Sequence, residues 1–107
     1  MSKYALIFKS NKAFDWTTLP REEAQKAMGA WGGWIASMGS AVQASDAFKF
    51  GGKSVSKAGA GSADNLLTGY VMVEADDFSA AEKLAEGAPS VASGQGSIEV
   101  YEILPTH

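Results

Sequence analysis

The stretch GYVMVEADDFSAAEKLAE, residues 69–86, joins a predicted strand directly to a predicted helix. In its first part Tyr70 and Met72 alternate with Val71 and Val73, so both faces of a strand over 69–74 are apolar. The pair Asp76-Asp77 then offers side-chain caps for a helix that Gly87 and Pro89 end. A strand that is apolar on both faces needs a covering layer on each side, and the helix supplies one of them.

The two ends of the chain repeat this strand pattern. The segment KYALIFK, residues 3–9, and the segment 97–104 are each short, rich in aromatic and branched residues, and apolar on both faces. Between 20 and 38 the spacing predicts a helix that starts at Pro20 and stops at Gly39. Its apolar stripe consists of Ala24, Ala27, Met28, Trp31, Trp34, Ile35 and Met38.

Glycine marks the remaining segments. Gly29, Gly32 and Gly33 interrupt the first helix, either because a backbone or a ligand approaches there or because that surface is poorly optimised for a helix. Residues 42–57 are predicted to form a hairpin that turns at Gly51-Gly52, with Phe48 and Phe50 on one face. Residues 57–65 are then a glycine-rich connection, and residues 90–96 are a loop.

The order strand, helix, strand, strand, helix, strand is that of an α+β, ferredoxin-like fold, in which two helices cover one face of an antiparallel sheet. With 107 residues, residues 1–107 form one domain. The second apolar face of the sheet then needs a cover, and a second copy of the chain is the simplest supplier. We therefore expect a homodimer in which two sheets stack or close into an α/β barrel.

Composition excludes several chemistries. The chain has no cysteine and one histidine, His107 at the end, so we expect no metal site, no cofactor and no thiol or histidine catalysis. A net charge of −3 without a basic cluster argues against nucleic acid as a partner. The apolar run 4–8 is too short for a membrane span or a secretion signal, which predicts a soluble, cytoplasmic protein with no membrane partner.

Two groups of side chains are candidates for function. An aromatic set could line a pocket for a small planar ligand, although aromatic residues on core faces often only pack; it consists of Trp31, Trp34, Phe48, Phe50 and Tyr70. Asp76 is a candidate acid or base, but the simpler interpretation is that Asp76 or Asp77 caps the second helix.

The run 69–103, GYVMVEADDFSAAEKLAEGAPSVASGQGSIEVYEI, and the opening KYALIFK resemble the YCII-related family, including its DGPF-domain branch. The resemblance implies a dimeric α/β barrel of ferredoxin-like subunits. It also implies a histidine early in the first helix and an aspartate before a proline after the second, a pair proposed as catalytic. Here these positions fall near Met28 and on Ala88, and the DGPF position falls on residues 57–60, KAGA.

The sequence thus favours a YCII-like homodimer that binds a small molecule and lacks the family's proposed catalytic pair. The alternative is a cofactor-free enzyme, such as an isomerase, lyase or monooxygenase, acting on an aromatic or polyketide-like substrate. A third class is a structural or regulatory partner of a larger assembly. The residues alone do not identify the ligand.

Overall fold

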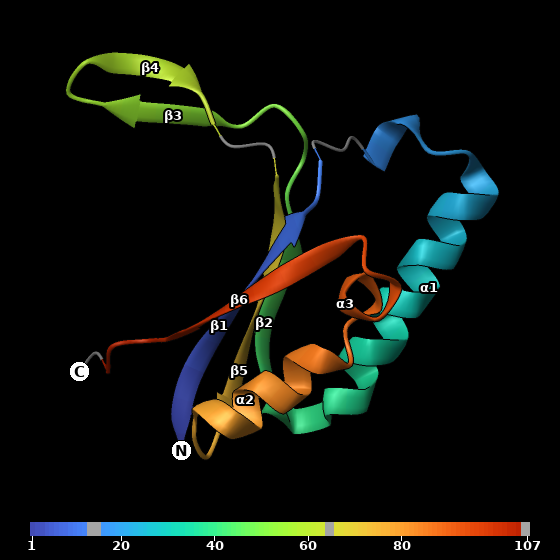
Figure 1. Cartoon of the computed structure of the whole chain (residues 1–107), viewed down its shortest axis with the longest axis vertical. Coiled ribbons are helices and arrows are strands. Elements are labelled where there is room, and N and C mark those ends of the chain that lie inside the picture. Colours follow the sequence, from blue (N-terminus) through green and yellow to red (C-terminus); the bar gives the residue numbers. More distant parts are fainter. Residues whose placement is uncertain (13–15, 64–65, 106–107) are drawn as a thin grey trace.

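The computed structural model describes residues 1–12, 16–63 and 66–105. Four antiparallel strands form the main sheet in the order β2-β5-β1-β6 (Figure 1). These strands are β1 (Ser2–Ser10), β2 (Val42–Ala47), β5 (Leu67–Ala75) and β6 (Gly96–Glu102). The first strand of the chain therefore lies inside the sheet, between two strands that come much later. This arrangement confirms the predicted α+β, ferredoxin-like fold.

The helices lie on one face of the sheet (Figure 1). They are the long α1 (Arg21–Met38) and the shorter α2 (Phe78–Glu86) and α3 (Pro89–Ser93), with two 3-10 turns, η1 (Trp16–Thr18) and η2 (Gly39–Ala41). α2 begins as predicted, because the side chain of Asp77 accepts a hydrogen bond from the Ala80 amide at 2.8 Å. In the described part of the chain, no helix is both long and apolar enough to span a membrane.

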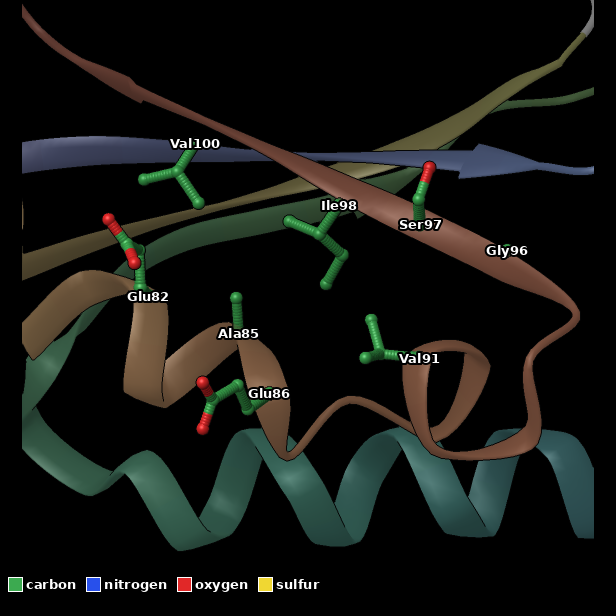
Figure 2. A pocket seen from close by; sticks show the side chains of 8 residues that line it. All are labelled: Glu82, Ala85, Glu86, Val91, Gly96, Ser97, Ile98 and Val100. Atoms are coloured by element: carbon green, nitrogen blue, oxygen red, sulfur yellow. The ribbon is translucent and has the colours of Figure 1, made fainter. Parts of the chain in front are cut away.

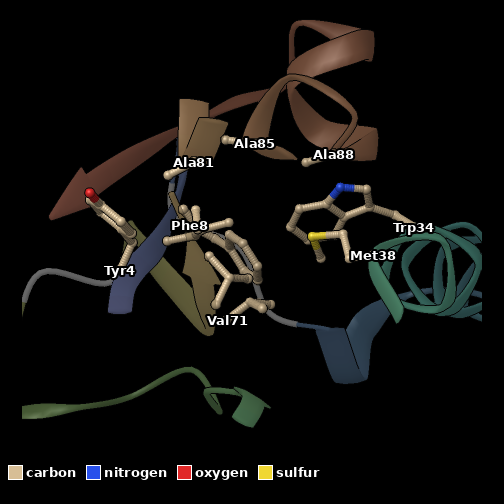
Figure 3. Packing of buried hydrophobic residues seen from close by; sticks show 11 residues of the cluster. Tyr4, Phe8, Trp34, Met38, Val71, Ala81, Ala85 and Ala88 are labelled. Carbon is tan, nitrogen blue, oxygen red and sulfur yellow. The ribbon is translucent and has the colours of Figure 1, made fainter. Parts of the chain in front are cut away.

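The core lies between this face and the helices (Figure 3). Its largest fully buried side chains, Leu6, Val71 and Val73, come from the two central strands β1 and β5. Around them pack further buried residues from the strands and helices, namely Tyr4, Phe8, Trp34, Met38, Ala75, Ala81, Ala85 and Ala88. The alternation along β1 and β5 thus directs every second residue into one core.

The opposite face of the sheet is also apolar at its centre. Ala5 of β1 lies opposite Met72 of β5, and Ile7 lies opposite Tyr70. All four side chains are only half-buried, since no helix covers them. At the β6 edge of this face, the Glu99 carboxylate accepts a hydrogen bond from the Tyr101 hydroxyl at 3.1 Å and raises the pKa of that phenol. This face is called the open face below.

The hairpin lies elsewhere than predicted. Gly51-Gly52 does not turn one strand back on the other, because β2 and the next strand belong to different sheets. Instead β3 (Lys53–Ser56) pairs with β4 (Gly59–Ser62), and the chain turns at Lys57-Ala58. The glycine-rich segment predicted to be a connection is therefore partly a strand. Gly59 makes this turn possible with a φ of +122°, a conformation that residues with a side chain rarely adopt.

Two further predictions are corrected. The predicted loop 90–96 contains most of α3, which begins at Pro89, since proline suits the first turn of a helix. Met28, placed on the buried stripe of the first helix, is 71% exposed, because only the last turns of α1 bury side chains, at Trp34 and Met38. The three helix glycines meet open space: a Cβ on Gly29, Gly32 or Gly33 would contact nothing within 4 Å. No neighbouring backbone in the described chain explains them.

Candidate functional site

A cavity with a volume of about 610 Å³ lies between α1 and the β2 edge of the sheet. That volume suits a small organic ligand. We call this cavity the α1 pocket. It is lined by Phe8, Thr17, Ala24, Met28, Trp31, Gly32, Ile35, Ser45, Asp46, Ala47, Phe48, Lys49, Phe50, Thr68, Tyr70 and Val71.

Aromatic rings from separate elements form much of its wall. Trp31 of α1 lies 4.7 Å from Phe8 of β1 between ring centroids, and Phe48 lies 6.0 Å from Tyr70 of β5. Phe48 and Phe50 remain 42% and 49% exposed, which is unusual for phenylalanine. Rings held open to solvent beside a cavity offer stacking surface to a planar molecule.

Close backbone contact places Tyr70 and Phe48 together. Gly69 precedes Tyr70, and a Cβ at this position would come within 2.7 Å of the Asp46 carbonyl oxygen. Glycine therefore lets β5 and β2 approach at this end of the sheet. The Phe48 amide then donates a hydrogen bond to the Thr68 carbonyl at 2.8 Å, which continues the pairing past the last residue of β2.

Four of the five predicted aromatic residues line the α1 pocket, and Trp34 does not. Trp34 is 7% exposed, and its Nε1 donates a hydrogen bond to the Leu84 carbonyl at 2.9 Å. The ring also lies 3.3 Å from the position that a Cβ on Gly87 would take. The structure thus assigns Trp34 to the seam between α1 and α2, while its contact with Trp31, 5.4 Å between centroids, supports the pocket wall from behind.

The polar side of the pocket was not predicted from the sequence. Asp46 and Lys49 bring charged groups to its lining, and Ser45 and Thr68 bring hydroxyls. The Tyr70 hydroxyl donates to Asp46 Oδ2 across 3.4 Å, a long hydrogen bond that a ligand could replace. Asp46 could have been found from the predicted strand that contains it. Once that strand, β2, is paired with β5, Asp46 lies directly opposite Tyr70.

Asp76 lies apart from this cavity. It is exposed at the end of β5 and is not among the lining residues, and neither is Asp77, which caps α2. The two positions that correspond to the family's proposed catalytic pair are also separated. Met28 lines the α1 pocket, whereas Ala88 is fully buried in the core. The four residues at the DGPF position, 57–60, form the turn between β3 and β4 and the start of β4.

Among the residues that the structure describes, no three His, Cys, Asp or Glu side chains lie together as a metal site would require. His107 lies outside the described residues. The expectation of no cofactor stays a prediction.

Comparison with known proteins gives a family and a distant likeness to solved structures. The YCII-related domain matches residues 3–107. A solved structure of 5-chloro-2-hydroxyhydroquinone dehydrochlorinase from Burkholderia phenoliruptrix AC1100, in complex with 2,5-dihydroxybenzoquinone, has the same fold with a TM-score of 0.61. It is 11% identical in sequence, and the similarity covers 94% of this chain and 93% of that one. No curated protein matches the sequence.

Proposed function

The chain belongs to the YCII-related domain family, and on that premise we propose that it is a small-molecule-binding protein that takes a planar aromatic ligand into the α1 pocket. The observation that carries this proposal is the cluster of exposed rings around one cavity. Phe48 and Phe50 remain about half exposed although a core of similar rings lies next to them. Burying them against a ligand would release the water that now covers them.

The polar lining narrows the ligand class. Asp46 accepts hydrogen bonds and Lys49 donates them, while Tyr70 can do both. A planar ring carrying hydroxyl or oxo groups would meet both kinds of partner. The structural neighbour was solved with a molecule of this kind, 2,5-dihydroxybenzoquinone, which makes hydroxylated quinones and aromatic acids sensible first probes.

We further propose that two copies join through the open face. Ala5, Ile7 and Met72 form the part of that apolar centre that does not line the α1 pocket, and a second sheet would bury it. Sedimentation at micromolar concentration should give a mass near twice 11.2 kDa. Ile7→Glu should shift the protein toward monomer or weaken its folding, whereas a wild-type mass of one chain would contradict this proposal.

A second candidate is a cofactor-free enzyme acting on such a ring. The observation that favours it is the Asp46 carboxylate next to the Tyr70 hydroxyl in the lining of the aromatic cavity, since a carboxylate there could accept a proton from a ring hydroxyl. Asp76 is the weaker choice for acid or base because it does not line the cavity. The cytoplasmic location and the lack of a nucleic-acid partner stay predictions.

Titration calorimetry with 2,5-dihydroxybenzoquinone and with benzoic acids tests the binding proposal. Phe48→Ala and Trp31→Ala should each weaken binding about threefold to tenfold, as expected for one lost stacking contact. Val91→Ala is the matched control, because Val91 is an exposed apolar residue outside the α1 pocket and should leave affinity unchanged. Equal effects of all three variants, or no binding by the wild type, would contradict the proposal.

Product analysis separates binder from enzyme. The same compounds are incubated with the protein and followed by NMR. If the protein is a binder, each compound is recovered unchanged. If it is an enzyme, wild-type protein converts one of them, and Asp46→Asn keeps the affinity but loses the conversion, since asparagine keeps the shape and cannot take the proton.

A further inference from the structure

The hairpin formed by β3 and β4, residues 53–62, extends away from the main sheet (Figure 1). All ten of its residues are exposed, including Val55, which is 80% exposed. A two-stranded hairpin alone in water is at best marginally stable, and three or more strands or a packed helix are normally needed. We call this hairpin the arm, and its exposure suggests that it packs against another surface.

The two faces of the arm differ in chemistry. Val55 lies opposite Ala60, and Lys53 shares their face because side chains alternate along a strand. Lys57 follows in the turn, so a small apolar centre lies between two positive charges. The other face consists of serine and glycine alone: Ser54 opposite Gly61 and Ser56 opposite Gly59. The first face is therefore the one suited to packing.

A surface of matching chemistry lies between β6 and the helices α2 and α3. Figure 2 shows the side chains of Ile98 and Val100 directed from β6 toward Ala85 and Val91, so the floor of this groove is apolar. Its volume is about 330 Å³. Glu82 and Glu86 project from successive turns of α2 at its margin (Figure 2), and both are exposed. We call this surface the α2 groove.

We propose that the arm of one copy docks in the α2 groove of a second copy. Val55 and Ala60 would cover the apolar floor, and Lys53 and Lys57 would meet Glu82 and Glu86. The apolar centre would supply buried area to the contact, and the opposite charges beside it would fix how the two surfaces align. The arm and α2 lie at opposite ends of the molecule (Figure 1), so the groove that receives an arm belongs to another copy.

This contact rests neither on ligand binding nor on the open face. Pairing of two open faces would bring the same surface of both copies together, whereas the arm and the groove are different surfaces. Arm docking would therefore be a second contact between copies, separate from the open face. The two contacts can be broken separately.

The absence of cysteine from the sequence allows a direct test. Val55→Cys and Val91→Cys are made in separate full-length proteins, mixed at equal micromolar concentration in a glutathione buffer, digested, and analysed by mass spectrometry for the peptide pair that joins the two cysteines. Because each protein carries one thiol, any mixed disulfide joins two molecules. The control replaces V91C with Gln25→Cys, an exposed position on α1 outside the groove. We expect at least ten times more mixed disulfide for the groove pair than for the control pair.

Charge exchange tests the register. Adding Lys53→Glu and Lys57→Glu to the V55C protein should reduce its mixed disulfide with V91C to the control yield. Adding Glu82→Lys and Glu86→Lys to the V91C protein should then restore it. Equal yields for the groove and control pairs would overturn the proposal, as would a yield that charge reversal leaves unchanged or that the double exchange fails to restore.

Discussion

Two helices lie on the same face of this sheet, and they close it differently. α2 and the segment after it present small side chains, and Ala81 and Ala88 are both fully buried. α1 presents Trp31 and Ile35 together with Gly32, and between α1 and the β2 edge the α1 pocket remains. Small residues let a helix pack closely on a sheet. Large residues keep the helix axis farther from the sheet, and a glycine beside them leaves part of that space unfilled. Side-chain size thus separates the half of the sheet on which α2 packs directly from the half in which the α1 pocket remains.

Removing the Trp34 side chain, which joins α1 to α2, should have the largest effect on stability. Trp34→Ala should destabilise the fold by about 3–5 kcal/mol, because the ring is buried and its Nε1 satisfies the Leu84 carbonyl. Trp31→Ala, on the half-buried pocket wall, should cost less than half as much. Urea unfolding measures both. If Trp34→Ala does not fold, Trp34→Phe should still cost about 0.5–1.5 kcal/mol, because it removes the hydrogen bond from Nε1 to the Leu84 carbonyl, which keeps only the longer one from the Gly87 amide. Equal losses of stability in Trp31→Ala and Trp34→Ala would contradict the different roles given to these two residues.

Replacing a small side chain by a larger one should lower the stability on the α2 side and leave it nearly unchanged on the α1 side. Ala81→Leu should destabilise the protein by about 1–3 kcal/mol, because the fully buried side chain has no room to grow. Ala24→Leu extends into the α1 pocket and should change stability by less than about 0.5 kcal/mol while weakening ligand binding. Thermal unfolding and calorimetry on the two variants check this pair. A larger loss of stability at Ala24 than at Ala81 would show that the cavity is not available space.

The two helices also start differently. α2 is capped by Asp77, whereas Pro20 at the start of α1 makes no side-chain cap. Asp77→Ala should therefore cost about 1 kcal/mol and Asp77→Asn only a few tenths, since asparagine caps nearly as well. Chemical denaturation gives this order. The reverse order, or a loss of catalytic turnover in Asp77→Asn with stability intact, would instead indicate an acid or base at this end of the strand.

The smallest effect concerns the glycines of α1. Gly33→Ala should stabilise the protein by about 0.4–1 kcal/mol, because alanine favours the helix and its Cβ meets nothing within 4 Å. Gly32→Ala is the matched variant: it should stabilise by a similar amount but reduce ligand affinity, since Gly32 lines the α1 pocket. Equal affinities for the two variants would show that the ligand does not approach this part of the helix.

The regular elements were predictable because their signals are local. Alternation identified β1, β5 and β6, and Asp77 and Gly87 marked the ends of α2. The arm was misplaced because Gly51-Gly52 is the stronger turn signal, whereas the turn at Lys57-Ala58 depends on the conformation of Gly59. A local pattern shows where a chain can turn and does not show which of two turns brings strands together.

The pocket was predictable only in part, for a related reason. Trp31 and Trp34 are three residues apart, so they lie about 60° apart on the helix and share one stripe. What separates their roles is the position of α2, whose Leu84 carbonyl takes up the indole of Trp34. Asp46 likewise became part of the site only through its register with Tyr70. Such assignments depend on contacts between segments distant in sequence.

The position of β1 inside the sheet has a consequence for synthesis of the protein. Ser2 pairs with Ala75 and Tyr4 with Glu102, so β1 has both neighbours only after roughly 100 further residues have been synthesised. At roughly 5–20 residues per second, that delay is on the order of ten seconds. During it the apolar run 4–8 is exposed, with Lys3 and Lys9 on either side. Charges that flank such a run disfavour its aggregation with other nascent chains. These two lysines therefore protect the unfolded chain during synthesis, before β1 is paired.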